Sequence, residues 1–114
     1  MPVRSLGSAV VIWPNAETVT AAARAWAAEV ARGATSVVAV GYFGSYARGD
    51  WGVGSDLDLV VIVEASAEPF ERRAVPFDTL GLPVPVDLLV YTRAEWARLA
   101  SRPRDVVWLV GTPP

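Results

Sequence analysis

The sequence contains no cysteine, no histidine and no lysine, so all ten of its basic residues are arginine. The absence of cysteine and histidine excludes a disulfide framework, the usual zinc sites, thiol catalysis and a Ser-His-Asp triad. The absence of lysine excludes a Schiff-base lysine and the lysine of a phosphate-binding P-loop. Carboxylates, hydroxyls, guanidinium groups and backbone amides remain for chemistry. Carboxylates without imidazole or thiolate favour hard cations such as Mg²⁺ or Mn²⁺.

The sequence also has no block of like charge and no long apolar run. Its formal net charge is −2 and its arginines are scattered, which disfavours nucleic-acid binding through a broad basic face. The apolar stretch at residues 9–13 is far shorter than a membrane span or a signal peptide. We therefore expect a cytoplasmic protein without membrane contact that folds as a single domain over residues 1–114.

The first helix is predicted within residues 13–33, where Asn15 can act as the N-cap and Gly33 can end the helix. Apolar residues recur there at helical spacing and predict a buried stripe of Val19, Ala22, Ala23, Trp26 and Val30. On this pattern Trp26 is expected to be a core residue.

Two further helices are indicated by their start and stop signals. The first half of residues 66–81 is expected to be helical, with Pro69 near the start and Pro76 at the end. Thr92 opens a capping box, which predicts a last helix over residues 92–100.

The remaining pattern is extended. Apolar, mostly β-branched runs predict three strands, at residues 36–43, 56–64 and 84–92. Residues 44–55 are glycine-rich and read as a loop with one helical turn at 45–48, whereas 106–110 fits either a short helix or a strand. Residues 8–13 fit a short strand or an extended lead-in. We expect a small α+β (α/β-like) domain with a mixed sheet of three to five strands flanked by helices.

Two aspartates at the start of the second strand are the first candidates for chemistry. Asp56 and Asp58 are two residues apart, so in a strand they project to one face, roughly 6.5–7 Å apart. Asp87 interrupts the next apolar strand, where a hydrophobic residue is usual. Neighbouring carboxylates repel each other, so we expect either an arginine or one or two divalent cations between them.

The glycine-rich turn before these aspartates has the features of a phosphate-binding segment. Gly44 and Ser45 follow a strand directly, which leaves backbone N–H groups and a hydroxyl free for anionic oxygens. Arg48 can add guanidinium donors to the same phosphates or can instead neutralise the aspartates. Trp51 could stack on a base, although a loop aromatic more often packs over the edge of its own domain.

Three segments, FGSYARG, SDLDLVV and VDLLV, resemble the signature of the DNA polymerase β-type nucleotidyltransferase superfamily. They are most similar to its small bacterial and archaeal branch, the minimal nucleotidyltransferases. Residues 43–45 supply the hydrophobic residue, glycine and serine of the signature. After ten further residues, positions 56–59 supply the alternating aspartates and hydrophobic residues, and Asp87 takes the place of the third carboxylate.

The resemblance implies a role for each of these side chains. Asp56 and Asp58 would bind the metal ions that carry the nucleotide. Asp87 would help to hold the catalytic metal and would activate the attacking group. Gly44 and Ser45 would bind oxygens of the β- and γ-phosphates. Arg48 matches a position whose role in the family is less settled.

The resemblance also implies an activity and a partner. The chain would transfer a nucleoside monophosphate, with ATP as the expected donor, to a hydroxyl acceptor in a Mg²⁺- or Mn²⁺-dependent reaction. Members of the minimal branch pair with helical HEPN-type proteins in toxin–antitoxin-like systems, so such a protein is the expected acceptor. Two alternatives stay open: a non-catalytic antitoxin-like module that neutralises a helical partner by docking, and an aminoglycoside-type enzyme. Five tryptophans also make an apolar homo-oligomeric interface conceivable.

Overall fold

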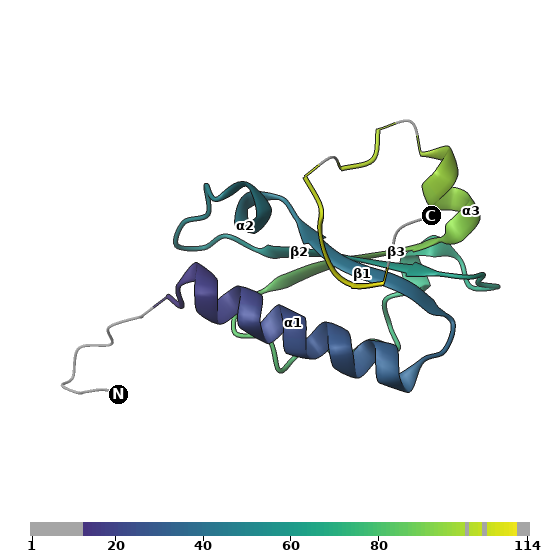
Figure 1. Ribbon diagram of the computed structural model, residues 1–114, viewed down its shortest axis with the longest axis horizontal. Helices are drawn as coiled ribbons and strands as arrows, with labels where there is room; N and C mark the ends of the chain where they lie inside the picture. Colours follow the sequence, from purple (N-terminus) through teal and green to yellow (C-terminus); the bar gives the residue numbers. More distant parts are fainter. Residues whose placement is uncertain (1–12, 100, 104, 112–114) are drawn as a thin grey trace.

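The computed structural model describes residues 13–99, 101–103 and 105–111 of the chain. In chain order the elements are α1 (Ala16–Gly33), β1 (Val37–Phe43), α2 (Ser45–Arg48), β2 (Leu57–Val63), the 3₁₀ turn η1 (Phe70–Arg72), β3 (Val86–Thr92), α3 (Arg93–Arg98) and β4 (Val107–Gly111). Helix α1 runs beneath a twisted sheet, while α2 and α3 lie near opposite ends of the molecule (Figure 1). The predicted mixed α+β architecture is confirmed.

The four strands form one mixed sheet in the order β3-β2-β1-β4. Strand β1 is antiparallel to both β2 and β4, whereas β2 and β3 are parallel. Of the two readings of residues 106–110, the strand is correct, because Tyr42 of β1 pairs with Val107 of β4. The expected lead-in at residues 8–12 lies outside the described residues.

Helix α1 begins and ends as its sequence predicts. The Asn15 side chain accepts a hydrogen bond from the backbone N–H of Thr18 at 2.8 Å, which satisfies one of the free donors of the first turn. The fully buried side chains of the helix are the small residues Val19, Ala23 and Ala27. These small side chains allow the helix to approach the sheet closely.

Trp26 corrects one prediction, because it is only partly buried at the rim of the core. Its indole N–H donates to the carbonyl oxygen of Asp78 at 2.8 Å. A buried indole N–H usually finds such a polar partner, so the ring sits at the edge of the core, where the helix meets a loop.

The helix predicted in residues 66–81 is wrong. Only η1 forms there, and turns and bends occupy most of the remaining positions. Pro69 and Pro76 leave too few residues between them to nucleate a stable α-helix. Arg73 also fixes the segment locally, because its guanidinium donates to the Glu68 carbonyl at 2.9 Å and to the Glu95 carboxylate at 3.0 Å.

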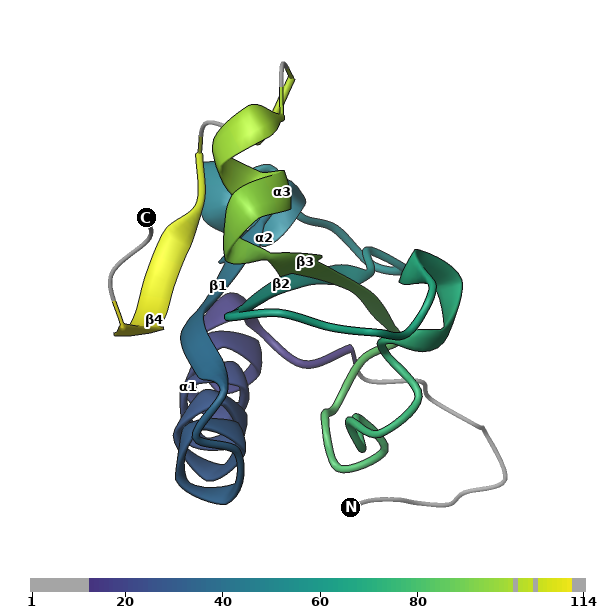
Figure 2. The same cartoon turned by 90° about the vertical axis from the view of Figure 1, so that its right-hand side faces the viewer.

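The two faces of the sheet differ in their cover (Figure 2). Leu57 and Leu59 of β2 are fully buried and belong to the same apolar cluster as Val19 and Ala23 of α1. On the other face, Trp96 of α3 is 3% exposed and closes one end. The site residues lie toward the other end of that second face. None of the described helices has the length and hydrophobicity needed to cross a bilayer.

Candidate nucleotidyltransferase site

The turn between β1 and α2 packs directly against one of the predicted carboxylates. Gly44 adopts φ 76° and ψ −149°, a conformation that is strained for any residue with a side chain. A Cβ atom added to Gly44 would overlap the Oδ2 atom of Asp58. Glycine is therefore required here for two reasons, and the predicted phosphate turn and the carboxylate are in contact.

Strand pairing brings the predicted carboxylates together. Asp58 and Asp87 are in register on the parallel strands β2 and β3, so their side chains leave the same face of the sheet. Asp56 lies two residues before Asp58, just ahead of the strand. The Leu57 N–H donates to the Pro85 carbonyl at 2.9 Å, which fixes the starts of the two strands relative to each other.

The electrostatics of Asp58 report on this clustering. Partial burial raises the pKa of the Asp58 carboxyl above its ordinary value, and the charges of Asp87 and Asp56 raise it further. The charge of Arg48 acts in the opposite direction, as the weakest of these effects. The three carboxylates thus form a negatively charged group that a nearby arginine compensates only in part.

The donor set of this group fits a hard divalent cation, since all its ligands are carboxylate oxygens. As placed, no three Asp or Glu side chains in the described part of the chain are close enough to enclose an ion. Asp56 and Asp87 are exposed, so their side chains have room to rotate toward Asp58. Binding of a cation would therefore require side-chain rotation.

Arg48 lies beside the site but has other partners. Its guanidinium contacts Asp50 at 3.1 Å and Asp105 at 3.6 Å, and the hydrogen bond that it donates to Asp50 is the main reason that the pKa of Arg48 is raised. Arg48 therefore influences Asp58 through space, and no direct ion pair joins it to the three site carboxylates. Asp105 was missed in the sequence, because a contact with such a distant residue leaves no local pattern.

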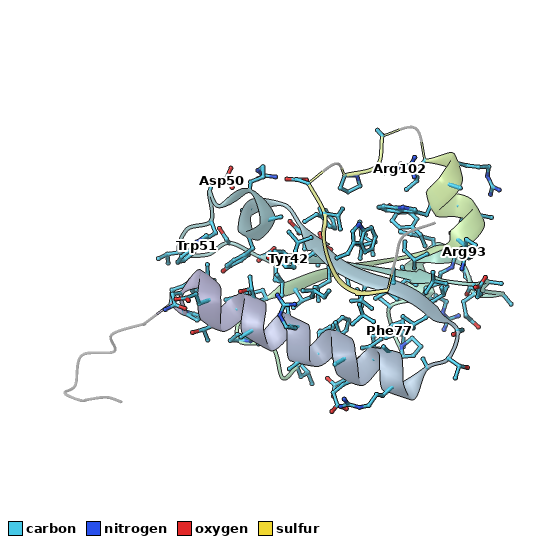
Figure 3. The ribbon with its side chains drawn as sticks, in the orientation of Figure 1. Tyr42, Asp50, Trp51, Phe77, Arg93 and Arg102 are labelled. Atoms are coloured by element: carbon cyan, nitrogen blue, oxygen red, sulfur yellow. The ribbon has the colours of Figure 1, made fainter. Side chains whose placement is uncertain are left out.

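An aromatic contact organises the loop that follows the turn. Trp51 stacks on Tyr46, with ring centroids 5.7 Å apart and the planes at 10°. Trp51 therefore packs on its own domain, which is the more common behaviour of an aromatic residue in a loop. Asp50 and Trp51 lie beside α2, whereas Arg93 lies at the other end of the molecule (Figure 3).

A cavity of about 690 Å³ lies on the other side of the sheet, between α1 and the loop that contains Phe77. Its lining includes Trp26 and Val30 and contains none of the site carboxylates. The candidate site is thus an open end of the sheet and not this cavity.

Comparison with known proteins identifies the family of this chain. The family model described as "Nucleotidyltransferase domain" matches residues 26–107, which is most of the chain and spans the turn and all three aspartates. The chain therefore belongs to the nucleotidyltransferase domain family. The protein is a nucleotidyltransferase of the polymerase β type.

A solved structure shares the fold. A provisionally assigned nucleotidyltransferase from Sulfolobus solfataricus superimposes with a TM-score of 0.65 at 24% identity, covering 82% of this chain and 80% of its own. A toxin–antitoxin structure with AMP-PNP matches at a TM-score of 0.48 and 18% identity, covering 78% of this chain and 73% of its own. No curated protein gives a significant match.

Proposed function

We propose that this nucleotidyltransferase moves AMP from ATP to a hydroxyl group of a protein acceptor and releases pyrophosphate, with Mg²⁺ bound by Asp56, Asp58 and Asp87. The acceptor oxygen would bond to the α-phosphorus while the bond from that phosphorus to the pyrophosphate oxygen breaks. The observation that carries this proposal is the contact between Gly44 and Asp58. It places a glycine turn suited to phosphate oxygens next to carboxylates suited to a cation, so one triphosphate could engage both.

On the nucleotide side, the chain would contribute backbone and hydroxyl donors. The Gly44 carbonyl accepts hydrogen bonds from the N–H groups of Ala47 and Arg48, each at 3.0 Å, so the turn is closed and its shape is set. The Ser45 hydroxyl and the first amides of the turn would then meet the oxygens of the β- and γ-phosphates. A preformed turn loses little entropy when it binds.

On the acceptor side, the carboxylates would bind the cation and receive a proton. Mg²⁺ held there would neutralise phosphate oxygens and stabilise charge on the entering and leaving oxygens. Asp87 would orient the acceptor hydroxyl and accept its proton. The in-register pairing of Asp87 with Asp58 supports this division, because one carboxylate can serve the nucleotide while its neighbour serves the acceptor.

The proposed acceptor is a helical HEPN-type protein. Asp56 and Asp87 are exposed, so the carboxylate end of the sheet is open enough for a macromolecule to approach. A small-molecule acceptor would be expected to need more enclosing walls. The family resemblance of the sequence supplies the HEPN class.

The experiment is incubation of the chain with α-labelled ATP, Mg²⁺ and a HEPN-type candidate. We expect label on the candidate, with loss of transfer after addition of EDTA and in the variants Asp56→Asn and Asp58→Asn. A tight complex that forms equally well with both variants and never carries label would instead establish the docking module.

A further inference from the structure

Tyr46 connects the proposed phosphate turn to the core of the protein. It is the residue after Ser45, yet its side chain is 5% exposed and packs in the cluster that contains Val19 and Leu57. Its hydroxyl accepts a hydrogen bond from the indole N–H of Trp13 at 3.2 Å. Trp51 stacks on its ring. Two segments distant in sequence thus meet on one side chain of the turn.

The turn needs such an anchor because its local structure is weak. Helix α2 has four residues, which is too short to be stable without tertiary contacts. Gly44 precedes it and Gly49 follows it, both with positive φ. The backbone entropy of these glycines favours a mobile segment. Tyr46 is the buried residue of α2, so the position of the turn depends on how firmly this ring is held.

The geometry points to Tyr46 as a positioning residue for nucleotide binding, with Trp13 and Trp51 holding its ring so that the amides of residues 44–48 keep one conformation. This inference rests on the proposed function, because it assumes that the first amides of the turn, those before Ala47, donate to phosphate oxygens. Tyr46 would act through the turn and would not touch the nucleotide. Its loss would therefore weaken binding of the triphosphate more than it slows the chemical step.

The test removes the stacking partner Trp51 and leaves the Tyr46 side chain itself unchanged. In Trp51→Leu we expect the KM for ATP to rise by about twofold to tenfold, the range that a lost aromatic contact supplies. The kcat should change by less than about twofold, because the carboxylates are untouched. Amide hydrogen exchange of residues 44–48, measured without nucleotide, should accelerate by a similar factor. Trp51→Phe should restore both values, and Tyr46→Phe should show a smaller rise in KM.

Phe77→Leu is the matched control. It removes the aromatic contact with Trp26, whose ring centroid lies 6.5 Å away, and Phe77 lies far from Trp51 in the molecule (Figure 3). We expect Phe77→Leu to lose about as much thermal stability as Trp51→Leu, with an unchanged KM for ATP and unchanged amide exchange in the turn. The inference is overturned if Trp51→Leu leaves KM and exchange as in the wild type, or if Phe77→Leu raises KM equally. If the wild type itself neither binds nor transfers ATP, the proposed function fails, and exchange alone then decides whether Tyr46 orders the turn.

Discussion

The two faces of strand β2 have opposite relations to solvent. Leu57, Leu59 and Val61 point toward α1 and are completely buried. On the other face, Val60 and Ile62 are also fully buried beside Trp96, but Asp58 stands at the open end of the row. Among the described residues, helix α1 covers its face of the strand along its length, whereas the second face is covered at one end only.

This difference separates the part of the strand that stabilises the fold from the part that carries the chemistry. Burial of the leucines contributes to stability through apolar area removed from water. The cluster of Asp56, Asp58 and Asp87 acts against stability, because like charges are held together without a direct arginine partner. A site that is unfavourable in the free protein and suited to a cation is characteristic of functional positions.

The largest expected effect comes from Asp58→Asn, on the second face of β2. Removing this carboxylate should reduce nucleotidyl transfer by at least about a thousandfold, since cation-based stabilisation of phosphoryl oxygens is worth several kcal/mol. It should also raise the melting temperature of the metal-free protein, because one of three repelling charges is gone. Parallel assays of transfer and thermal unfolding, with and without Mg²⁺, test both effects. A variant that is both inactive and less stable than the wild type would contradict this contrast between the faces.

Leu59→Ala changes the opposite face of β2, the α1 face. Leu59 is 0% exposed, so truncation should lower the free energy of unfolding by about 3 kcal/mol through lost burial and a residual cavity. Transfer activity per folded molecule should stay near the wild-type value at a temperature where the variant is folded. Urea titration gives the first quantity and an activity assay corrected for folded fraction gives the second. If the variant lost transfer activity per folded molecule as well as stability, the two faces would not be independent.

Much of this contrast could be predicted from the sequence. The alternation of Asp and Leu at positions 56–59 has the period of a strand, so it assigns leucines to one face and aspartates to the other. Asp87 was predicted to join them because a carboxylate within an apolar strand needs a reason, and the register of β2 with β3 places it beside Asp58. The position of Gly44 and Ser45 directly after a strand predicts the turn that contacts Asp58.

What sequence reasoning missed depends on contacts between distant residues. Nothing near Arg73 indicates that its guanidinium will reach Glu95 and hold the segment after η1 in place. Likewise the spacing that places Trp26 on the inner stripe of α1 does not show that its N–H will be drawn to the Asp78 carbonyl at the rim. Periodicity predicts which way a side chain points, and the tertiary partners decide how deeply it is buried.

An ion pair between Arg73 and Glu95 lies at the end of the second face that α3 covers. The hydrogen bonds from the Arg73 guanidinium, followed by that from the Thr92 backbone, lower the pKa of Glu95 to about 2. A depressed carboxyl pKa contributes stability above the unfolded-state value. That contribution is lost as the pH falls from about 4.5 through about 2.

Glu95→Gln should therefore cost about 1–2 kcal/mol at pH 7, discounted because the Glu95 side chain is 34% exposed. The difference from the wild type should shrink as the pH is lowered toward 2. Urea unfolding across this pH range measures it. Glu64→Gln is the matched control, because Glu64 also pairs with an arginine, Arg93, but both side chains are well exposed. If Glu64→Gln loses as much stability as Glu95→Gln, the Arg73–Glu95 pair contributes no more than an exposed ion pair.

The smallest expected effect concerns the open end and the partners of Arg48. Asp105→Asn removes the more distant carboxylate, at 3.6 Å, and leaves Asp50 at 3.1 Å. Exposed ion pairs contribute little to stability, so the melting temperature should not change measurably. If Arg48 turns toward a bound triphosphate, freeing it from one competitor should tighten ATP binding by at most about threefold. Asp50→Asn should tighten binding more, since it removes the closer partner, and calorimetric titration with Mg²⁺–ATP measures both. Unchanged affinity in both variants would assign Arg48 to the loop alone and leave phosphate recognition to the Gly44–Ser45 turn.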